Sequence, residues 1–309
     1  MPMTNTHSYR GIVWLDLESP DENEISSIVK RYGLHPLVGE ELHSSTSLAK
    51  IDMFKDYTLI VLTLPIRTRH NDSYVVVNRE VDFVIGKHFL ITSRYEAIEQ
   101  LEYFAKVFEA NEILGKEEKI EHAGHIFYYM IKRLYAGMKN DLENIRDAIV
   151  SAEGHIFKGE DKNMVRNLSN LNRELIDFKQ TARIHHDIWT NLSDRSEKSI
   201  FGQDFAPYIE DLKTEFAHIH ELITNARELL SDLRDTNDSL LNTKQNQIIK
   251  DLTLVAFIFY PATFIAALFT IPAVEVPFIG HSWGWAFILL SMVVMSFGIW
   301  LFFKKMRWI

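Results

Sequence analysis

The sequence of 309 residues contains no cysteine and only 13 glycines and 8 prolines. Without cysteine there is no disulfide scaffold, no thiolate metal site and no cysteine nucleophile. The low glycine and proline content excludes a low-complexity or collagen-like chain. Basic residues are also in deficit, because 33 Lys and Arg stand against 42 Asp and Glu and give a formal net charge of −9. That balance argues against a nucleic-acid-binding protein, which needs a basic face to neutralise phosphates.

Motifs that carry catalysis are missing as well. The sequence holds no phosphate-binding glycine loop, no H-E-x-x-H metal motif and no nucleophile elbow. Histidines stand close together at positions 122 and 125, 185 and 186, and 218 and 220. Imidazole is a common metal ligand, but no pair has a third ligand at a fixed spacing. His185 also falls on an apolar helical stripe, where a hydrogen-bonded packing role is simpler. We therefore expect that the protein is not an enzyme and that it has neither a cofactor nor a dedicated histidine metal site.

Two long uncharged runs lie in the last sixth of the chain. Residues 252–271 read LTLVAFIFYPATFIAALFTI and residues 283–303 read WGWAFILLSMVVMSFGIWLFF. About 20 apolar residues is the length that a helix needs to cross a bilayer core. The alternative is a pair of buried helices in a large soluble protein, but few such helices are apolar all round for this length. We predict transmembrane helices at 251–271 and 283–303.

The flanking charges orient these two segments. The connector at 272–282 contains Glu275 and no Lys or Arg, whereas basic residues flank the outer ends at Lys244, Lys250, Lys304, Lys305 and Arg307. The positive-inside rule then places both termini, including the basic tail 304–309, in the cytoplasm and the connector outside. The N-terminus has no apolar stretch of the kind found in a signal peptide. We predict a multi-pass protein of the plasma (inner) membrane.

Residues 1–115 predict a cytoplasmic α/β domain, with a mixed sheet and flanking helices. The segment GIVWLDL alternates apolar and polar residues like a half-buried strand. The segments KIDMF and YTLIVLTLP predict a hairpin around Lys55. The segments EVDFVIG and HFLITS predict another pair of strands, with a turn at Gly86. Ser19 to Glu22 reads as a capping box with Pro at the first helical position, opening a helix that ends near Gly33. A further helix is expected from about residue 95 to 114.

Residues 116–250 change to a helical period with heptad spacing. Apolar residues recur three and four apart in three sets, which are 131, 135, 138, 142, 145, 149, 152 and 156; 168, 171, 175, 178, 182, 185, 189 and 192; and 212, 216, 219, 223, 226, 230, 233, 237 and 240. This predicts long helices packed as a coiled-coil-like stalk. Because no Gly or Pro occurs between Tyr208 and Tyr260, one helix should run from about Tyr208 to Thr270, roughly 90 Å at 1.5 Å per residue.

The third apolar set becomes polar as it approaches the first span. Asn237, Lys244 and Gln247 occupy positions where an apolar residue would continue the packing. A buried polar group costs free energy unless it is paired. Either these residues fix the helix register, or this stretch surrounds water.

Several segments together resemble the CorA-type family of divalent-cation channels. They are WLDLESPDENE, LHPLVGEEL, DYTLIVLTLP, HFLITSRY, LNRELIDF, KQNQIIKDLTLVAFIFYPATFIAALF and the terminal KKMRWI. The resemblance covers nearly the whole chain. It implies a funnel-shaped homopentamer in the lipid bilayer, with the long helix around a central pore and the second span facing lipid. Its partners would be its own copies and the transported divalent metal ions, such as Mg²⁺, Co²⁺, Ni²⁺ or Zn²⁺.

The sequence departs from the family at the outer end of the first span. The family has Gly-Met-Asn there, whereas a gap-free extension of the match gives Thr270, Ile271 and Pro272. This indicates a divergent member, similar to the CmaX-like proteins. Neutral hydrogen-bond acceptors suit a hydrated Mg²⁺ ion, and Pro272 offers neither a side-chain acceptor nor an N–H. The Thr270 hydroxyl and free backbone carbonyls would have to substitute.

This departure leaves three functions open. The first is a divalent-cation channel with altered Mg²⁺ selectivity. The second is a membrane scaffold or sensor that has kept the architecture and lost conduction. The third is a proton-coupled zinc transporter. Asn246 and Thr263, both polar and both retained, favour conduction over the scaffold.

The resemblance also assigns an ion pathway to one stripe of the long helix. The stripe contains Asn246, Ile249, Leu252 or Thr253, Ala256, Tyr260 and Thr263, at steps of three or four. Asn246 and Thr263 would form polar rings, Ile249 and Leu252 apolar collars that gate by expelling water, and Tyr260 a constriction. The alternative is a helix-packing stripe in which the Thr263 hydroxyl bonds its own helix.

Two acidic positions complete the expected site. Five copies of Glu275 would make a negative collar at the entrance that concentrates cations, although it could equally be an ordinary loop acid. By resemblance, Asp235 corresponds to an acid that binds a regulatory metal ion between subunits, and Asp232 and Asp238 could share that role. The alternative is a stalk acid that simply faces water.

Overall fold

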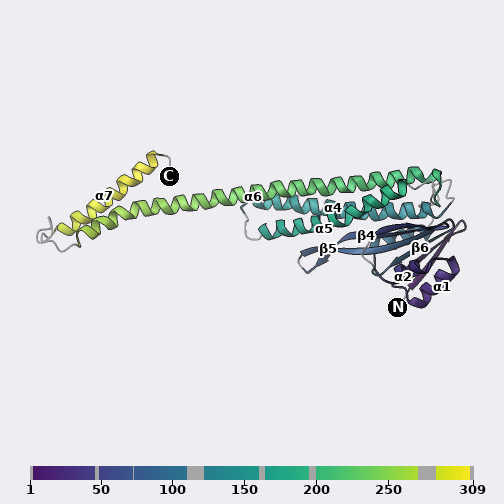
Figure 1. Cartoon of the computed structure of the whole chain (residues 1–309). Coiled ribbons are helices and arrows are strands. Elements are labelled where there is room, and N and C mark those ends of the chain that lie inside the picture. The colour runs from purple at the N-terminus through teal and green to yellow at the C-terminus, as the bar shows by residue number, and fades with distance from the viewer. Residues whose placement is uncertain are drawn as a thin grey trace. The chain divides into compact units, whose positions relative to one another are not determined.

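The computed structural model describes residues 3–45, 49–71, 73–109, 122–159, 164–194, 200–270 and 283–306 (Figure 1). The chain divides into two compact units, Met1–Arg234 and Asp235–Ile309. The first unit contains a sheet, the helices that cover it and the first part of the long helix. The second unit contains the rest of the long helix and the C-terminal helix.

The first unit is built on a six-stranded mixed sheet. Its strands are β1 (Met3–Tyr9), β2 (Ile12–Glu18), β3 (Lys50–Met53), β4 (Tyr57–His70), β5 (Ser73–Gly86) and β6 (Phe89–Arg94). Their spatial order is β1-β2-β6-β5-β4-β3. The strands β2 and β6 pair in parallel, and the other neighbours pair antiparallel. The β3–β4 and β5–β6 hairpins confirm the sequence prediction, while β1 and the length of the β4–β5 hairpin were not foreseen.

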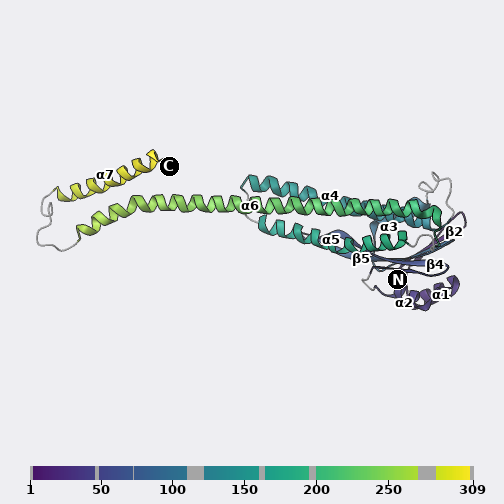
Figure 2. The same cartoon turned by 45° about the horizontal axis from the view of Figure 1, so that its top comes forward.

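One face of the sheet is covered by α1 (Glu22–Tyr32) and α2 (Pro36–His43) (Figure 1, Figure 2). The predicted capping box is wrong by two residues. Asp21, not Ser19, is the N-cap, and its carboxylate accepts from the Glu24 N–H while the Glu24 carboxylate accepts from the Asp21 N–H. An aspartate N-cap with a glutamate three residues later satisfies two free N–H groups reciprocally. The helix ends, as predicted, at Gly33, whose φ of 63° is left-handed.

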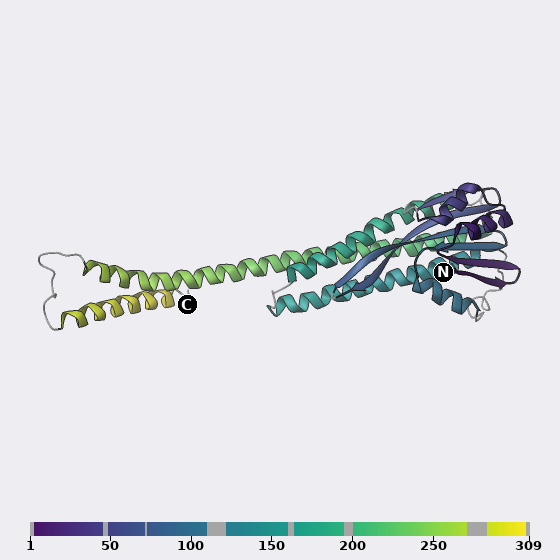
Figure 3. The ribbon, with the colours of Figure 1, turned by 90° about the horizontal axis from the view of Figure 1, so that it is seen from below.

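The other face is covered by α3 (Glu99–Glu109), α4 (Gly124–Phe157) and α5 (Met164–Asp194), and the first part of α6 (Ala206–Leu268) packs with them in the same core. The first two heptad sets are buried throughout, and the third is buried from Leu212 to Asn237, whereas Leu240 is 41% exposed. One hydrophobic core contains residues of the strands and of all these helices. The β4–β5 hairpin packs against α5 (Figure 3). The long α6 confirms the continuous helix that the lack of glycine predicted.

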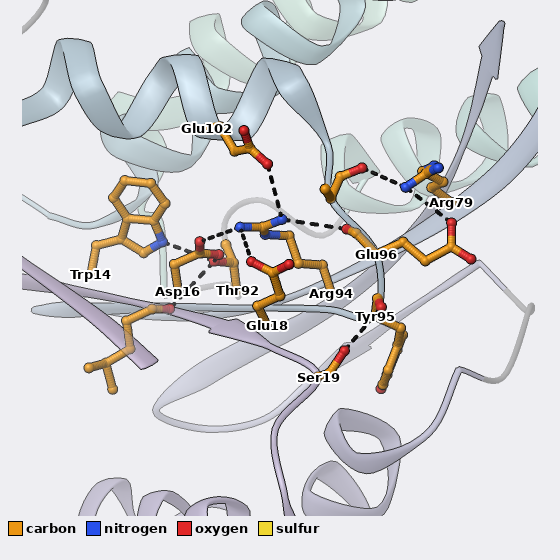
Figure 4. Close-up of polar contacts among 12 residues, drawn as sticks. Trp14, Asp16, Glu18, Ser19, Arg79, Thr92, Arg94, Tyr95, Glu96 and Glu102 are labelled. Atoms are coloured by element: carbon orange, nitrogen blue, oxygen red, sulfur yellow. Dashed lines mark hydrogen bonds and ion pairs between the residues drawn. The ribbon is translucent and has the colours of Figure 1, made fainter. Parts of the chain in front are cut away.

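A buried arginine joins the carboxyl ends of the parallel strands β2 and β6 (Figure 4). The Arg94 guanidinium contacts the carboxylates of Asp16 at 3.2 Å and Glu18 at 3.0 Å, with its side chain only 3% exposed. Asp16 also accepts from the Thr92 hydroxyl at 2.7 Å, and Thr92 accepts from the indole N–H of Trp14 at 3.0 Å. Since a buried charge is costly unless it is paired, this network fixes the strand ends to one another.

Candidate ion pathway and the stalk

The second unit pairs α6 with α7 (Gly284–Lys305), and both carry a window long and apolar enough to cross a membrane. The Ser296 hydroxyl of α7 donates to the Ile258 carbonyl of α6 at 3.2 Å, and the rings of Phe257 and Phe303 lie 5.9 Å apart. Leu254, one turn before Ile258, is only 7% exposed. These contacts define the face of α6 that packs against α7.

The predicted pathway stripe lies on a different face of α6. Ile249, Leu252 and Tyr260 are 52%, 67% and 69% exposed. Asn246 and Thr263 are exposed and Ala256 is half-buried. At about 100° per residue, this stripe is centred roughly half a turn away from Leu254 and Ile258. Packing against α7 therefore does not account for the stripe, which is free to contact another molecule, lipid or water.

The threonine hydroxyls along this segment bond their own helix, as the packing interpretation expects. Thr263 donates to the Tyr260 carbonyl at 2.8 Å, Thr270 to the Ala267 carbonyl at 2.7 Å, and Thr253 to the Ile249 carbonyl at 2.7 Å. A hydroxyl that has given its hydrogen to a carbonyl still has lone pairs to offer as an acceptor. On an exposed face, such an oxygen suits a cation or a water of its hydration shell.

Part of the expected site lies outside the described residues, namely Ile271, Pro272 and Glu275. Thr270 is the last described residue before them and is exposed. The helix itself ends at Leu268. Beyond it, the Phe269 N–H donates to the Ile265 carbonyl, and the Thr270 N–H and hydroxyl both donate to the Ala267 carbonyl. The Thr270 hydroxyl therefore lies at this end of the span with lone pairs that can still accept a hydrogen bond.

The acids expected to sense a metal ion are all accessible. Asp235 is exposed on α6, as are Asp232 and Asp238. Asp235 precedes Asn246 by eleven residues, about three turns of 3.6 residues, so the two lie on the same face of the helix. Within the described ranges, no group of three or more His, Asp or Glu is arranged to hold a metal ion. A regulatory ion at Asp235 would accordingly need ligands from another copy.

The buried histidine has the packing role that its position predicted. The His185 side chain is fully buried, with Nε2 donating to the Thr63 carbonyl at 2.8 Å and Nδ1 accepting from the Tyr135 hydroxyl at 3.0 Å. The Trp189 indole N–H donates to the Tyr135 oxygen at 2.6 Å, which leaves the Tyr135 hydrogen for His185. Burial lowers the pKa of His185 from 6.5 to about 4. The ring is therefore neutral and fully hydrogen-bonded.

The other histidines lie in two different environments. The rings of His122 and His125 lie 4.6 Å apart, tilted by 44°, near Phe205, and burial lowers the pKa of His122 to about 4. His186 and His220, from two separate pairs, line one cavity between α5 and α6. The sequence spacing gave no signal of that meeting, because it depends on how two antiparallel helices are aligned.

Comparison with known proteins agrees with this architecture. A family model described as "CorA-like Mg2+ transporter protein" matches residues 9–305. The chain belongs to this CorA-like family. The cobalt/magnesium transport protein CorA of Thermotoga maritima is 23% identical over 297 residues, which cover 96% of this chain and 83% of that protein.

Two solved structures share the CorA-like fold. The CorA magnesium transporter of Methanocaldococcus jannaschii has a TM-score of 0.82 at 20% identity, covering 98% of this chain and 94% of that one. The full-length CmaX protein has a TM-score of 0.72 at 17% identity, covering 96% and 89%. The mixed-sheet domain, the long helix and the two C-terminal apolar helices of this CorA-like chain are thus features of the shared fold.

Proposed function

We propose that this chain is the subunit of a homopentameric channel of the plasma (inner) membrane, which conducts divalent cations along α6. Both termini would be cytoplasmic, because the basic residues flank the outer ends of the two spans. The membrane potential would drive inward cation movement, since moving charge down the potential releases free energy. As in other members of a transporter family, no chemical step on the cation is required.

The observation that carries this proposal is the exposed stripe on α6, opposite the face that packs on α7. It includes the amide of Asn246 and the hydroxyl of Thr263, separated by the apolar Ile249 and Leu252. In a five-fold ring, the polar residues would hold a hydrated ion through neutral oxygens. The apolar residues would form collars that close the pore when they expel water.

Thr270, Ile271 and Pro272 replace the family's Gly-Met-Asn at the outer mouth. Without an asparagine ring, the acceptors for a hydrated ion would be the Thr270 hydroxyl and free carbonyls. These oxygens are fewer and less adaptable than side-chain amides, so discrimination in favour of Mg²⁺ should weaken. Glu275 would add a negative collar that raises the local concentration of any divalent cation.

Asp235 would make the channel responsive to the cytoplasmic metal concentration. A cation bridging Asp235 of adjacent copies would stabilise a closed symmetric state, with Asp232 and Asp238 nearby on the same helix. Metal depletion would then shift the population towards open states, because the ion binds the two states with different affinity.

The test is cation uptake by sealed vesicles that contain the purified protein, with an imposed membrane potential. Mg²⁺, Co²⁺, Ni²⁺ and Zn²⁺ are compared over a full concentration series. We expect saturable uptake of at least one cation, reduced by Thr263→Val. Leu290→Ala, a change on an exposed face of α7, serves as the control and should leave uptake unchanged.

A scaffold or sensor is the second candidate, favoured by the loss of Gly-Met-Asn. It predicts an intact pentamer with no uptake of any of the four cations, with and without the Asp235→Ala change. A proton-coupled zinc transporter would show zinc uptake that rises with an imposed pH gradient. A monomer in solution would contradict the channel altogether.

A further inference from the structure

An unusual concentration of positive charge lies between α5 and α6 in the first unit. A cavity of about 510 Å³ there is lined by Lys179 of α5 and by Arg227 and Arg234 of α6. Three neutral polar side chains, those of Asn172, Thr224 and Ser231, line it as well, and Glu228 is the one acidic residue among the described residues that line it. In a protein with a net charge of −9, a cavity with three cations and a single carboxylate stands out.

The spacing of these residues shows how the cavity is built. Thr224, Arg227, Ser231 and Arg234 recur at steps of three and four, so they share one face of α6. Asn172 and Lys179 are seven residues apart, which is two turns of α5. The two faces oppose each other, with polar groups from both helices directed at the same space.

The cations in this cavity have no partners among the described residues. Neither Lys179, Arg227 nor Arg234 forms an ion pair there. The opposite side of α6 is different, because Lys132 and Lys139 of α4 pair with the carboxylates of Asp211 and Glu215. The fold thus neutralises the α4–α6 side internally and leaves the α5–α6 side positive.

A second cavity, of about 450 Å³, also lies between α5 and α6, nearer the start of α6, and we call the two cavities together the α5–α6 groove. It is lined by Arg183, His186 and Asp187 of α5 and by Phe216, Ala217 and His220 of α6. His220 and Arg227 are seven residues apart, about 10 Å along the helix. A ligand that reached both cavities would place a phosphate chain at the arginine end and an organic group at the histidine end.

We propose that this α5–α6 groove binds a small molecule carrying more than one phosphate group. Arg227 and Arg234 would bind phosphate oxygens through their forked N–H donors, a geometry that favours bidentate contacts. Lys179 would add a point charge from the opposite helix, while Ser231, Thr224 and Asn172 donate neutral hydrogen bonds. The groove is too short and too isolated for a nucleic acid, which needs an extended basic face.

The ligand would bridge cations on the two helices, which repel each other across the groove. Binding to the folded state alone raises the unfolding temperature by mass action. Because the α6 segment concerned lies before the segment assigned to the membrane, the effect can be measured without any reference to cation transport.

The experiment is isothermal titration calorimetry on the purified full-length protein with magnesium-free ATP, tripolyphosphate and inorganic phosphate as probes. We expect saturable binding of one ATP or tripolyphosphate per chain, weaker binding of inorganic phosphate, and a loss of affinity at high salt. Losing a charged hydrogen bond typically costs about tenfold or more in affinity, so Arg227→Gln and Arg234→Gln should each weaken binding at least tenfold. Tighter binding of ATP than of tripolyphosphate would show that the histidine end contacts the organic group.

The matched control is Arg173→Gln, which removes a cation that is exposed on α5 and does not line the groove. It should leave the affinity within twofold, and circular dichroism should confirm that all variants are folded. Absence of saturable binding, or an equal loss in the control, would overturn the proposal. So would dissociation of the oligomer by Arg227→Gln and Arg234→Gln without any bound probe, since that result would assign the groove to a second copy of the chain.

Discussion

The hydroxyl of Ser296 donates to the backbone carbonyl of Ile258 at 3.2 Å, which fixes the face of α6 that α7 covers. This bond joins residues 38 positions apart in the sequence. In an apolar environment, a polar side chain gains by finding a partner on a neighbouring helix. By fixing one face of α6 against α7, the contact leaves the stripe from Asn246 to Thr263 on the opposite face.

Replacing Ser296 with alanine should loosen the α6–α7 pair. Hydrogen bonds between membrane helices contribute about 0.6 kcal/mol on average, so we expect a loss of that size in the free energy of unfolding. Unfolding in detergent, followed by tryptophan fluorescence, measures it. Ser291→Ala is the control, because the Ser291 hydroxyl bonds the Ile288 carbonyl of its own helix; an equal loss there would contradict the interhelical role.

Restoring Gly-Met-Asn at positions 270–272 should raise Mg²⁺ uptake relative to the parent chain. Five asparagine amides would supply the neutral acceptors that a hydrated Mg²⁺ ion needs. The measurement is vesicle uptake of Mg²⁺ and Zn²⁺, expressed as a ratio. Thr270→Gly alone is the control, since it removes the hydroxyl without adding an amide. An unchanged ratio in the triple variant would mean that selectivity is set elsewhere in the pore.

His185 should make the first unit less stable as the pH falls. Its pKa is about 4 in the folded chain and 6.5 as the reference value, so between these values the unfolded chain binds a proton that the folded chain does not. The stability contribution is complete above pH 6.5 and is lost progressively down to pH 4. A difference of this size corresponds to about 3 kcal/mol.

Denaturant unfolding between pH 4 and 7, with Trp189 as the fluorescent reporter, measures this loss. His218→Gln, at an exposed histidine, is a control that should keep the pH dependence. His185→Gln should reduce the pH dependence without abolishing it, because the pKa of His122 is also lowered to about 4. The variant should also be less stable at neutral pH, because the hydrogen-bond chain from Trp189 through Tyr135 is disturbed. A parent protein whose stability does not change over this range would contradict the neutral buried ring.

Asp82 should make the first unit less stable as the pH rises, which is opposite to the effect of His185. Burial, together with the nearby carboxylates of Glu80 and Glu41, raises the pKa of Asp82 well above its usual value of 3.8. One of its carboxyl oxygens, Oδ1, has no hydrogen-bond partner among the described residues. The folded chain keeps this proton at a pH where the unfolded chain has lost it, so the stability that Asp82 contributes is present at low pH and is lost as the pH rises through its folded pKa.

The variant Asp82→Asn should consequently be more stable than the parent at neutral pH, because it removes the cost of a buried charge. Chemical unfolding at pH 5 and at pH 8 measures the effect, which should be larger at pH 8. Asp52→Asn is the control, since Asp52 is half exposed and, like Asp82, lies near the charge of Lys50. Destabilisation of the Asp82 variant at pH 8 would contradict the raised pKa.

Periodic patterns account for the elements that could be predicted. Every position of the first heptad set, from Ile131 to Ile156, is buried, because a helix can bury only the residues that recur at its own period. The two foreseen hairpins likewise combined alternation with a turn signal. The N-terminal strand β1 gave no such pattern, since MTNTHSY is polar, and it forms because it pairs along β2. The shift of the helix cap from Ser19 to Asp21 depended on which carboxylate reaches the free N–H groups.

The candidate site, too, could be predicted only in part from the sequence. Steps of three or four residues placed Asn246, Ile249 and Thr263 on one stripe of a helix. Nothing in the sequence indicated which face of α6 would pack against α7. The meeting of Lys179 with Arg227 and Arg234 was also invisible, because it needs the alignment of two antiparallel helices 48 and more residues apart in the chain.

Composition and periodicity alone determined that this chain has two apolar spans, a mixed α/β domain and one unbroken helix, since these depend on local hydrophobicity and backbone propensity. The tertiary structure decided which surfaces are covered and which remain open. Burial of His185 and Asp82, the closed face of α6 and the α5–α6 groove, whose cations have no ion-pair partner in the described part of the chain, all arise from contacts between distant segments. Such contacts are fixed only when the whole core packs.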